Sequence, residues 1–401
     1  MSTIRRSVDG LRGDGRGWTL LFIAAGWLFI NGFRVVLPAL LPQIKADFTI
    51  DNASAGFALT VLWFMYASLQ FPAGVLADRT GERRLVILGA ILGALSFVSF
   101  YVAPLYALFV LACALFGIGA GLFGTPRDML LSKTFPANDS TAYGVTFAAG
   151  SIGAAALPFA ATAIAGRWDW RLAVVAHLPL LLLIGVGLWR VVPSPTDIEA
   201  SSRLSPRETV RRTLAALTNR SILFSSGVMI LFIFTYQALL SFLPTYLVEV
   251  KGVGQGYAAA LFGLLFVVGA IINPLAGHFA DNHGERRTVA AVIVLATVTL
   301  LVLPFTNGLL ALSILVPLLG LRIAVGPLAS AFIVRELPTS IQGTGWGFLR
   351  TLFFGLGATG STIMGLFGDA GLFDLGFLVL TGLTALTLLF WLRIPHSDLD
   401  E

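Results

Sequence analysis

Charge is scarce in this sequence, and cysteine is almost absent. Charged residues make up 12% of the 401 positions and hydrophobic residues 57%, and the mean hydropathy is +0.87. A soluble domain carries about 25% charged residues, so this composition excludes one and predicts an integral membrane protein. The single cysteine, Cys113, excludes a disulfide framework and any metal site built from several cysteines.

The residue patterns of an enzyme are missing as well. The sequence has no Ser/His/Asp arrangement, no metal-ligand spacing and no glycine-rich loop of the kind that holds phosphates. The segments between its apolar runs are too short for a soluble domain. We therefore expect no catalysis, no cofactor and no metal. The isoelectric point near 9.6 reflects membrane topology and indicates no nucleic-acid partner.

What the sequence does contain is a series of long apolar runs. A helix needs roughly 20 apolar residues to cross the hydrocarbon layer. Runs such as 180–184 are apolar on every face, which excludes the alternating pattern of a transmembrane barrel. The predicted fold is an all-α membrane protein with about twelve spans, near 18–42, 54–76, 85–104, 106–130, 141–165, 170–190, 221–248, 257–280, 288–305, 308–332, 343–367 and 372–393.

Lys and Arg are distributed unequally between the two sides of the predicted membrane. With the N-terminus inside, 18 of the 26 lie on the inner side, four lie within spans and four lie outside, namely Lys45, Arg167, Arg171 and Lys251. Cytoplasmic loops carry an excess of basic residues. We therefore expect both termini in the cytoplasm, with the protein in the plasma or inner membrane and the lipid bilayer as its surroundings.

One loop sequence occurs twice. Residues 74–84 read GVLADRTGERR and residues 277–287 read GHFADNHGERR, at an offset of 203 residues, half the chain. Internal repeats of this kind are typical of transporters built from two related halves. We predict a cytoplasmic tail, a six-helix bundle, a cytoplasmic linker, a second six-helix bundle and a second tail, at 1–17, 18–190, 191–220, 221–393 and 394–401.

The predicted linker contains a helix-start pattern. Ser205 can cap a helix that begins at Pro206, and Glu208 stands at its third position. The arginines that follow would lie near anionic head groups if this helix rests on the inner membrane surface. A plain solvated linker is the other interpretation.

These features together resemble the major facilitator superfamily, over essentially the whole chain. The resemblance is carried by two six-span halves, a central linker and the twice-repeated loop at matching positions, and by the glycines at 117, 119 and 121 with Pro126 in the fourth span. It implies a monomeric transporter that binds a small-molecule substrate and works by alternating access. It also implies that spans one, two, five, seven, eight and eleven line a central cavity.

The repeated loop is expected to control conformation. Small residues allow helices to approach closely in lipid, so Gly74 and Gly277 indicate such approaches. The resemblance implies that the loop aspartates latch the outward-facing state by docking on the opposite half, Asp78 near Gly343 and Asp281 near Ser140 and Thr141. Glu82 stands where the family usually has a basic residue. The predicted gating residues are Gly74, Asp78, Arg79, Gly81, Arg83, Gly277, Asp281, Gly284 and Arg286.

Four arginines fall within predicted spans: Arg34, Arg127, Arg322 and Arg350. A buried charge costs several kcal/mol unless it is paired, and Asp128 is the one acidic residue near a span. Arginines that face a cavity therefore indicate a substrate that brings the negative charge. The guanidinium fork suits a carboxylate or phosphate. Arg127 and Arg350 have a second interpretation, in which they reach the inner head groups or, for Arg127, pair with Asp128.

Arg34 is the strongest candidate for a substrate contact. The first span carries one polar and aromatic stripe at positions i, i+4, i+7 and i+11, formed by Trp27, Asn31, Arg34 and Pro38. The offset of 203 places Arg34 opposite Gln237, beside Tyr236. Members of the family that move organic anions often carry an arginine about forty residues before the loop, as here. The predicted substrate-binding residues are Arg34, Asn31, Gln237, Tyr236, Arg322, Arg350 and Trp346.

The coupling ion is open at the sequence level. His177 in the sixth span is a titratable group suited to proton exchange, and a packing histidine is the other interpretation. Exchange of anions or uniport needs no such group. The alternative function is an exporter of lipophilic drugs, which would keep an acidic residue in its cavity. A membrane receptor or enzyme is a further alternative with no motif behind it.

Overall fold

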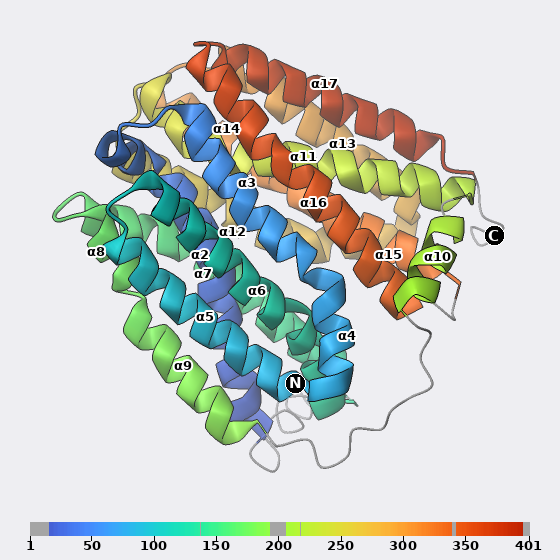
Figure 1. Cartoon of the computed structure of the whole chain (residues 1–401). Helices are drawn as coiled ribbons and strands as arrows, with labels where there is room; N and C mark the ends of the chain where they lie inside the picture. Colours follow the sequence, from blue (N-terminus) through green and yellow to red (C-terminus); the bar gives the residue numbers. More distant parts are fainter. Residues whose placement is uncertain (1–15, 137, 193–205, 217, 339–341, 396–401) are drawn as a thin grey trace, which may run out of the picture. The chain divides into compact units, whose positions relative to one another are not determined.

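The computed structural model describes residues 16–136, 138–192, 206–216, 218–338 and 342–395, and throughout these ranges it contains helices and no strand (Figure 1). Most of the two predicted tails and much of the linker, including the capping Ser205, lie outside the described residues. The expected all-α membrane fold is confirmed. The chain forms two compact units.

Unit 1 comprises residues 1–40 and 65–203. The helices of the first half of the chain are α2 (Arg16–Phe48), α3 (Asn52–Ser68), α4 (Gln70–Thr80), α5 (Glu82–Val102), α6 (Tyr106–Thr134), α7 (Asp139–Ala165), α8 (Trp170–Val175) and α9 (Leu178–Val191). Two of them, α2 and α3, are divided between unit 1 and unit 2.

Unit 2 comprises residues 41–64 and 204–401. Its further helices are α10 (Pro206–Ala216), α11 (Arg220–Glu249), α12 (Gln255–His283), α13 (Glu285–Val302), α14 (Leu309–Leu318), α15 (Val325–Glu336), α16 (Gln342–Asp369) and α17 (Phe373–Leu392). Short 3₁₀ segments, Leu303–Phe305 and Leu319–Ala324, follow α13 and α14.

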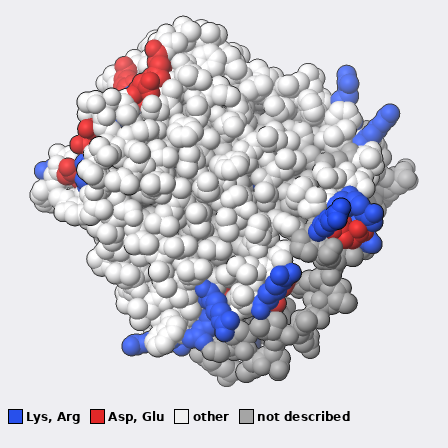
Figure 2. Space-filling model, viewed as in Figure 1, with Lys and Arg blue, Asp and Glu red and all other residues white. Residues whose placement is uncertain are grey.

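The number of membrane spans agrees with the expectation. Among the described residues, eleven helices are long and apolar enough to cross a membrane, and twelve if α3 and α4, which meet at a bend of 41°, form one span. Pro72 explains the bend, because its ring has no N–H to donate and clashes with the carbonyl four residues earlier. On the face drawn in Figure 2, side chains midway along the helices are uncharged and charged groups gather near helix ends.

Residues 41–64, which comprise the end of α2 and most of α3, pack with unit 2. Residues 41–64 cluster with the second half of the chain rather than with 18–190. Their contacts with α16 are polar and close. The Asp369 carboxylate accepts hydrogen bonds from the backbone N–H groups of Asn52 and Ala53, each at 2.7 Å. Further along, Thr60 Oγ1 donates to the Ala358 carbonyl at 2.8 Å.

Asp51 caps the N-terminus of α3. Its Oδ1 accepts the backbone N–H of Ser54 at 2.8 Å, which satisfies a donor that the helix leaves unpaired. A side-chain hydrogen bond with Ser54, followed by this backbone bond, holds the pKa of Asp51 below its usual 3.8. A carboxyl whose pKa falls on folding stabilises the folded state above its unfolded pKa, and that stabilisation disappears as the pH falls through the folded pKa.

We expect Asp51→Ala to cost about 1 kcal/mol at neutral pH, the usual value of an N-cap. Thermal unfolding of both proteins between pH 7 and pH 3 measures it. The difference in melting temperature should be constant at neutral pH and should shrink once the pH drops below the unfolded pKa of 3.8. Asp51→Asn caps without a charge and should show no such pH dependence. A difference that does not change at all between pH 7 and pH 3 contradicts the assignment.

The repeated loop has the same structure in both units. Gly81 and Gly284 adopt φ angles of 86° and 87°, the left-handed region that favours glycine. Both following glutamates pair with a cation at the end of the fourth helix in their half, Glu82 with Lys133 and Glu285 with Arg335. The glutamate that follows the second glycine of the loop is therefore engaged in an ion pair in both copies.

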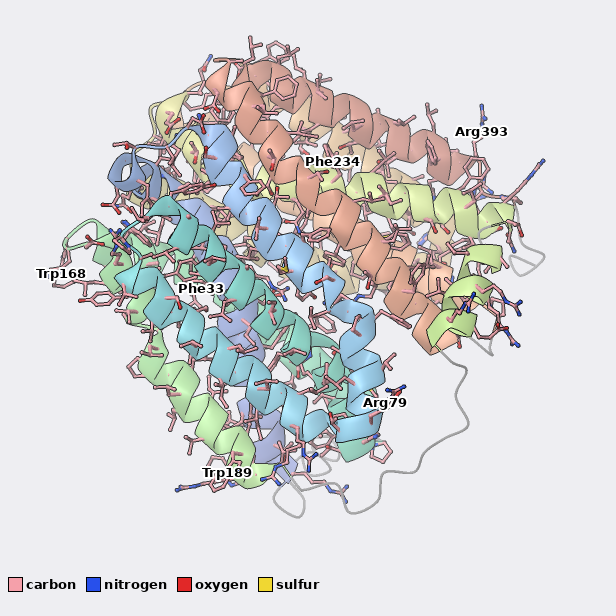
Figure 3. The ribbon with its side chains drawn as sticks, in the orientation of Figure 1. Phe33, Arg79, Trp168, Trp189, Phe234 and Arg393 are labelled. Atoms are coloured by element: carbon pink, nitrogen blue, oxygen red, sulfur yellow. The ribbon has the colours of Figure 1, made fainter. Side chains whose placement is uncertain are left out.

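The arginine that directly follows the loop glutamate caps the last span of each half. Arg83 donates to the Trp189 carbonyl, and Arg286 donates to the Leu392 carbonyl at 2.5 Å. Both the donors and the acceptors are separated by 203 residues. Arg79 and Trp189 lie at the same end of unit 1 (Figure 3). Cationic groups at helix C-termini interact favourably with the unpaired carbonyls there, so these arginines hold each loop to its own bundle.

The loop's first glycines do not mark close approaches within their units. A Cβ on Gly74 would lie 3.4 Å from Thr125, an ordinary contact, and a Cβ on Gly277 would meet open space. Gly277 borders a surface pocket of about 490 Å³ with Asp281 and Arg286. Within each unit these two positions therefore show no tight helix contact, and a close approach of helices at them stays a prediction.

Candidate functional site

Two arginines of unit 1 surround one tryptophan. The Arg127 Cζ lies 3.7 Å from the centroid of the Trp27 ring, and the Arg34 Cζ lies 5.1 Å from it. The Arg34 guanidinium also stacks on Tyr66, with its Cζ 3.9 Å from that ring's centroid. All four side chains belong to residues that are more than nine-tenths buried. We call Trp27, Arg34, Tyr66, Arg127 and Asp128 the arginine cluster.

The cluster lies where α2 passes α7. Asn31 Nδ2 donates to the Gly150 carbonyl at 3.0 Å. A Cβ on Gly150 would stand 2.4 Å from Trp27 Nε1, so glycine at this position gives the indole its space. Arg34 follows 18 residues after the start of the 33-residue α2, near its middle. Gly150 of α7 thus contacts two residues of the predicted stripe, Trp27 and Asn31. The role of the stripe in substrate binding stays a prediction.

Arg127 pairs with its neighbour Asp128. Its Nε donates to Asp128 Oδ1 at 2.9 Å, and its Nη2 reaches the same oxygen. Arg127 is 2% exposed, so it forms this pair within unit 1, the second interpretation that the sequence left open. Its Nη1 has no hydrogen-bond partner among the described residues. The Tyr143 hydroxyl, on α7, donates a hydrogen bond to the Asp128 backbone carbonyl at 2.7 Å and so connects α7 with α6.

The arrangement has the chemistry to bind an anion through charged hydrogen bonds from guanidinium groups. Stacking on aromatic faces leaves the edges of a guanidinium, which carry its N–H groups, available for hydrogen bonds. In a medium of low dielectric constant, such charged hydrogen bonds are strong.

Arg322 lies inside unit 2, and its role as a substrate contact stays a prediction. It sits in the 3₁₀ segment that interrupts the tenth span, and it is 1% exposed. Its Nη2 donates to Thr235 Oγ1 at 2.5 Å and its Nη1 to the Thr235 carbonyl at 3.4 Å. The space beside it, about 10 Å³, is bordered by Thr384 and Thr387, room for about one water molecule.

The other predicted contacts of the second half occupy α11 and α16. Gln237 is fully buried, and neither its amide oxygen nor its amide nitrogen has a hydrogen-bond partner among the described residues. Tyr236 stacks on Phe232 with ring centroids 5.6 Å apart. Trp346 packs on Phe353 at 6.2 Å, and the Arg350 Cζ lies 6.0 Å from the Phe354 ring. A buried amide without partners is costly, which favours a polar ligand for Gln237.

His177 packs among aromatic rings. It stands in the break between α8 and α9, where its Nδ1 lies 3.2 Å from the Val174 carbonyl oxygen. The rings of Phe33 and Phe97 lie 6.2 Å and 6.3 Å from it, centroid to centroid, and Figure 3 marks Phe33 within unit 1. This is the environment of the packing histidine that the sequence left open. Its role as a proton carrier stays a prediction.

The docking partners expected for the loop aspartates lie partly outside the described residues. The side chain of Ser140 is not described, and neither are the surroundings of Gly343. Asp78 is half-buried at the end of α4 and Asp281 is exposed near the end of α12. Their gating role, with that of Arg79 and the other loop residues, stays a prediction.

Sequence reasoning missed Tyr66. The residue comes from α3, two residues before that helix ends, and nothing in its neighbours along the chain connects it with Arg34. An isolated tyrosine in an otherwise apolar run was the available signal. Among the described residues, no group of His, Cys, Asp and Glu side chains could hold a metal ion.

The chain is similar in sequence to known transport proteins. A family model described as Major Facilitator Superfamily matches residues 22–361. The hexuronate transporter of Bacillus subtilis (strain 168) is 23% identical over 407 residues, covering 95% of this chain and 94% of that protein. Multidrug resistance protein MdtH of Proteus mirabilis (strain HI4320) is 25% identical over 361 residues, covering 87% and 85%.

The fold has a counterpart among solved structures. The crystal structure of the nucleoside transporter NupG matches with a TM-score of 0.81 at 13% identity, covering 94% of this chain and all of that one. At this identity the match shows the fold alone. The hexuronate transporter and MdtH are nearly equally identical to this chain but are named for different kinds of transported compound. Similarity by itself therefore does not select a substrate class.

Proposed function

Because this chain belongs to the Major Facilitator Superfamily, we propose that it is a secondary transporter of a small organic anion that carries a carboxylate or phosphate group. The chain is a membrane transporter and not an enzyme. The substrate class is the part that we propose. The arginine cluster is the observation that carries it, since two buried guanidinium groups stacked on aromatic rings form a site for an anion.

The charges of the cluster support an anion over a cation. The one carboxylate in it, that of Asp128, already accepts two hydrogen bonds from Arg127. To bind a lipophilic cation, the protein would need a further acidic side chain at the site, and the cation would meet Arg34 as a like charge. The relative named for hexuronate transport supports the same choice.

Export of lipophilic drugs is the second candidate. The relative named for multidrug resistance favours it, and so do the aromatic faces of Trp27 and Tyr66, which can contact a flat apolar molecule. In this case the arginines would serve packing and the substrate would carry no negative charge.

The transport cycle that we propose follows from the duplicated halves. The two halves would alternate access to the substrate, with the loop aspartates Asp78 and Asp281 biasing the balance between states. The excess of Lys and Arg on one side assigns the two repeated loops and both termini to the cytoplasm, in the plasma or inner membrane.

A thermal-shift screen of the purified full-length protein separates the two candidates. The probes are D-glucuronate for carboxylates, glycerol 3-phosphate for phosphates and tetraphenylphosphonium for lipophilic cations. A ligand present at 100 times its dissociation constant stabilises the folded state by about 2.7 kcal/mol. We expect stabilisation by at least one anion and none by the cation. Stabilisation by the cation alone would overturn the anion proposal in favour of drug export.

A further inference from the structure

A groove of about 400 Å³ lies between α12 and α13 in unit 2. Apolar side chains from both helices line its length: Ile272, Leu275, Phe279, Ala291, Val292 and Leu295. Leu275, Phe279 and Leu295 are each about half exposed. Both helices are long and apolar enough to span a membrane, so exposed apolar side chains along them suit contact with lipid chains.

The groove is as long as one leaflet of the bilayer. Ile272 and His283 stand at its two ends on α12, eleven residues apart along the chain. At a rise of about 1.5 Å per residue, the groove extends about 16 Å along the helix. Half of a hydrocarbon core of about 30 Å is about 15 Å. An acyl chain that enters at the loop end therefore fits the groove without crossing the middle of the membrane.

Basic side chains border one end of the groove. His283 and Arg287 stand on either side of the Gly284 turn, and both are exposed. The His283 ring lies on Phe279, with centroids 5.4 Å apart. None of the described residues that line the groove is acidic. The adjacent Glu285 is engaged elsewhere, by Arg335. The end of the groove thus complements a negative charge.

We propose that this groove binds an anionic phospholipid of the leaflet that contacts the repeated loops. One acyl chain occupies the apolar groove, and the phosphate accepts hydrogen bonds from the Arg287 guanidinium, with His283 as a second donor. Arginine binds phosphate through two parallel N–H groups. Basic pockets between membrane helices on the cytoplasmic side are suited to lipid head groups, and the excess of Lys and Arg assigns this end to that side.

The first half of the chain offers a matched control. At an offset of 203 residues, Arg84 corresponds to Arg287, and it is exposed at the start of α5 in the same way. Thr80 corresponds to His283 and Pro72 to Leu275. Arg84 therefore has the same charge and the same place in the loop, without a second basic residue or the apolar wall at Leu275.

Native mass spectrometry of the delipidated full-length protein tests the proposal. The probes are phosphatidylglycerol, which is anionic, phosphatidylcholine, which is zwitterionic, and glycerol 3-phosphate, which lacks acyl chains. We expect phosphatidylglycerol to bind best. Arg287→Gln should lower its affinity about fivefold, the effect of one basic residue near a membrane surface, and Arg84→Gln should leave it unchanged. Leu275→Trp, which fills the groove at an exposed position, should also lower binding.

Three results would overturn the proposal. Equal losses in Arg287→Gln and Arg84→Gln would show general electrostatic attraction and no site. Equal affinity for the two phospholipids would remove the role of the basic end. Competition by glycerol 3-phosphate as strong as that by the intact lipid would show that the site takes free phosphate and that the groove contributes nothing. Melting temperatures of the three variants close to the wild type confirm that folding is intact.

Discussion

Replacing Arg34 by lysine is expected to reduce transport at least about tenfold while leaving the folded yield unchanged. Lysine keeps the positive charge but loses the planar fork that binds a carboxylate through two N–H groups. It also loses the stacked geometry on Tyr66, where the guanidinium carbon lies 3.9 Å from the ring centroid. Hydrogen bonds to charged groups are worth about 1.5–3 kcal/mol, and about 1.4 kcal/mol is a factor of ten.

The measurement is uptake into proteoliposomes of the anion that gives the largest thermal shift. Arg190→Lys is the matched control, since Arg190 is exposed at the end of α9 and the same substitution there should be silent. Size-exclusion profiles of the variants report folding. If Arg34→Ala transports at the wild-type rate, Arg34 is not a substrate contact. If Arg34→Lys loses the thermal shift as well as transport, the defect is in binding.

Replacing Asp369 by asparagine is expected to loosen residues 52–64 from α16 and to shift the equilibrium between the packed and the loosened arrangement of these two segments about tenfold. The Asp369 carboxylate accepts two N–H groups at the start of α3, where the helix dipole favours a negative charge. Asparagine has the same size but no charge, and its single carbonyl oxygen takes the place of two. Because Asp369 is exposed, we expect a loss near the low end for charged hydrogen bonds, about 1.5 kcal/mol.

Cysteine labelling measures this shift. Ala358 is fully buried, and its carbonyl accepts the hydrogen bond from Thr60. In a background of Cys113→Ser, Ala358→Cys should react slowly with a water-soluble maleimide, and adding Asp369→Asn should speed the reaction about tenfold. The control is Asp169→Asn, because Asp169 caps α8, a helix of unit 1. Equal labelling with and without the Asp369 substitution would show that this carboxylate does not hold the two segments together.

The arginine cluster shows what a sequence pattern can and cannot predict. The depth of Arg34 in the first span and its spacing from Trp27 and Asn31 follow from helix periodicity. In the structure Trp27 and Asn31 meet Gly150 of α7, and the Arg34 guanidinium lies 5.1 Å from the Trp27 ring. Tyr66 was not predictable, because its contact with Arg34 depends on the rotation of α3 about its own axis. No local pattern reports that rotation when the helix is apolar on all faces.

Arg322 illustrates the opposite case. Its position near the middle of a span suggested a substrate contact, since a buried charge without a carboxylate partner is costly. The structure surrounds it with side chains of unit 2 and gives it Thr235 as a partner. A hydroxyl and a backbone carbonyl are partners that a census of acidic residues overlooks. Counting charges therefore locates buried arginines but does not identify their ligands.

The sequence by itself determined the membrane class, the all-α fold, the number of spans and the duplication of the two halves. Each of these depends on composition or on local repetition, which the bilayer enforces along every span. The tertiary structure alone decided that Arg127 pairs with Asp128 beneath Trp27, that residues 41–64 pack with unit 2, and that a groove with a basic end forms between α12 and α13. These depend on which faces of apolar helices meet, and in lipid that choice is made by close packing and polar contacts rather than by hydrophobicity.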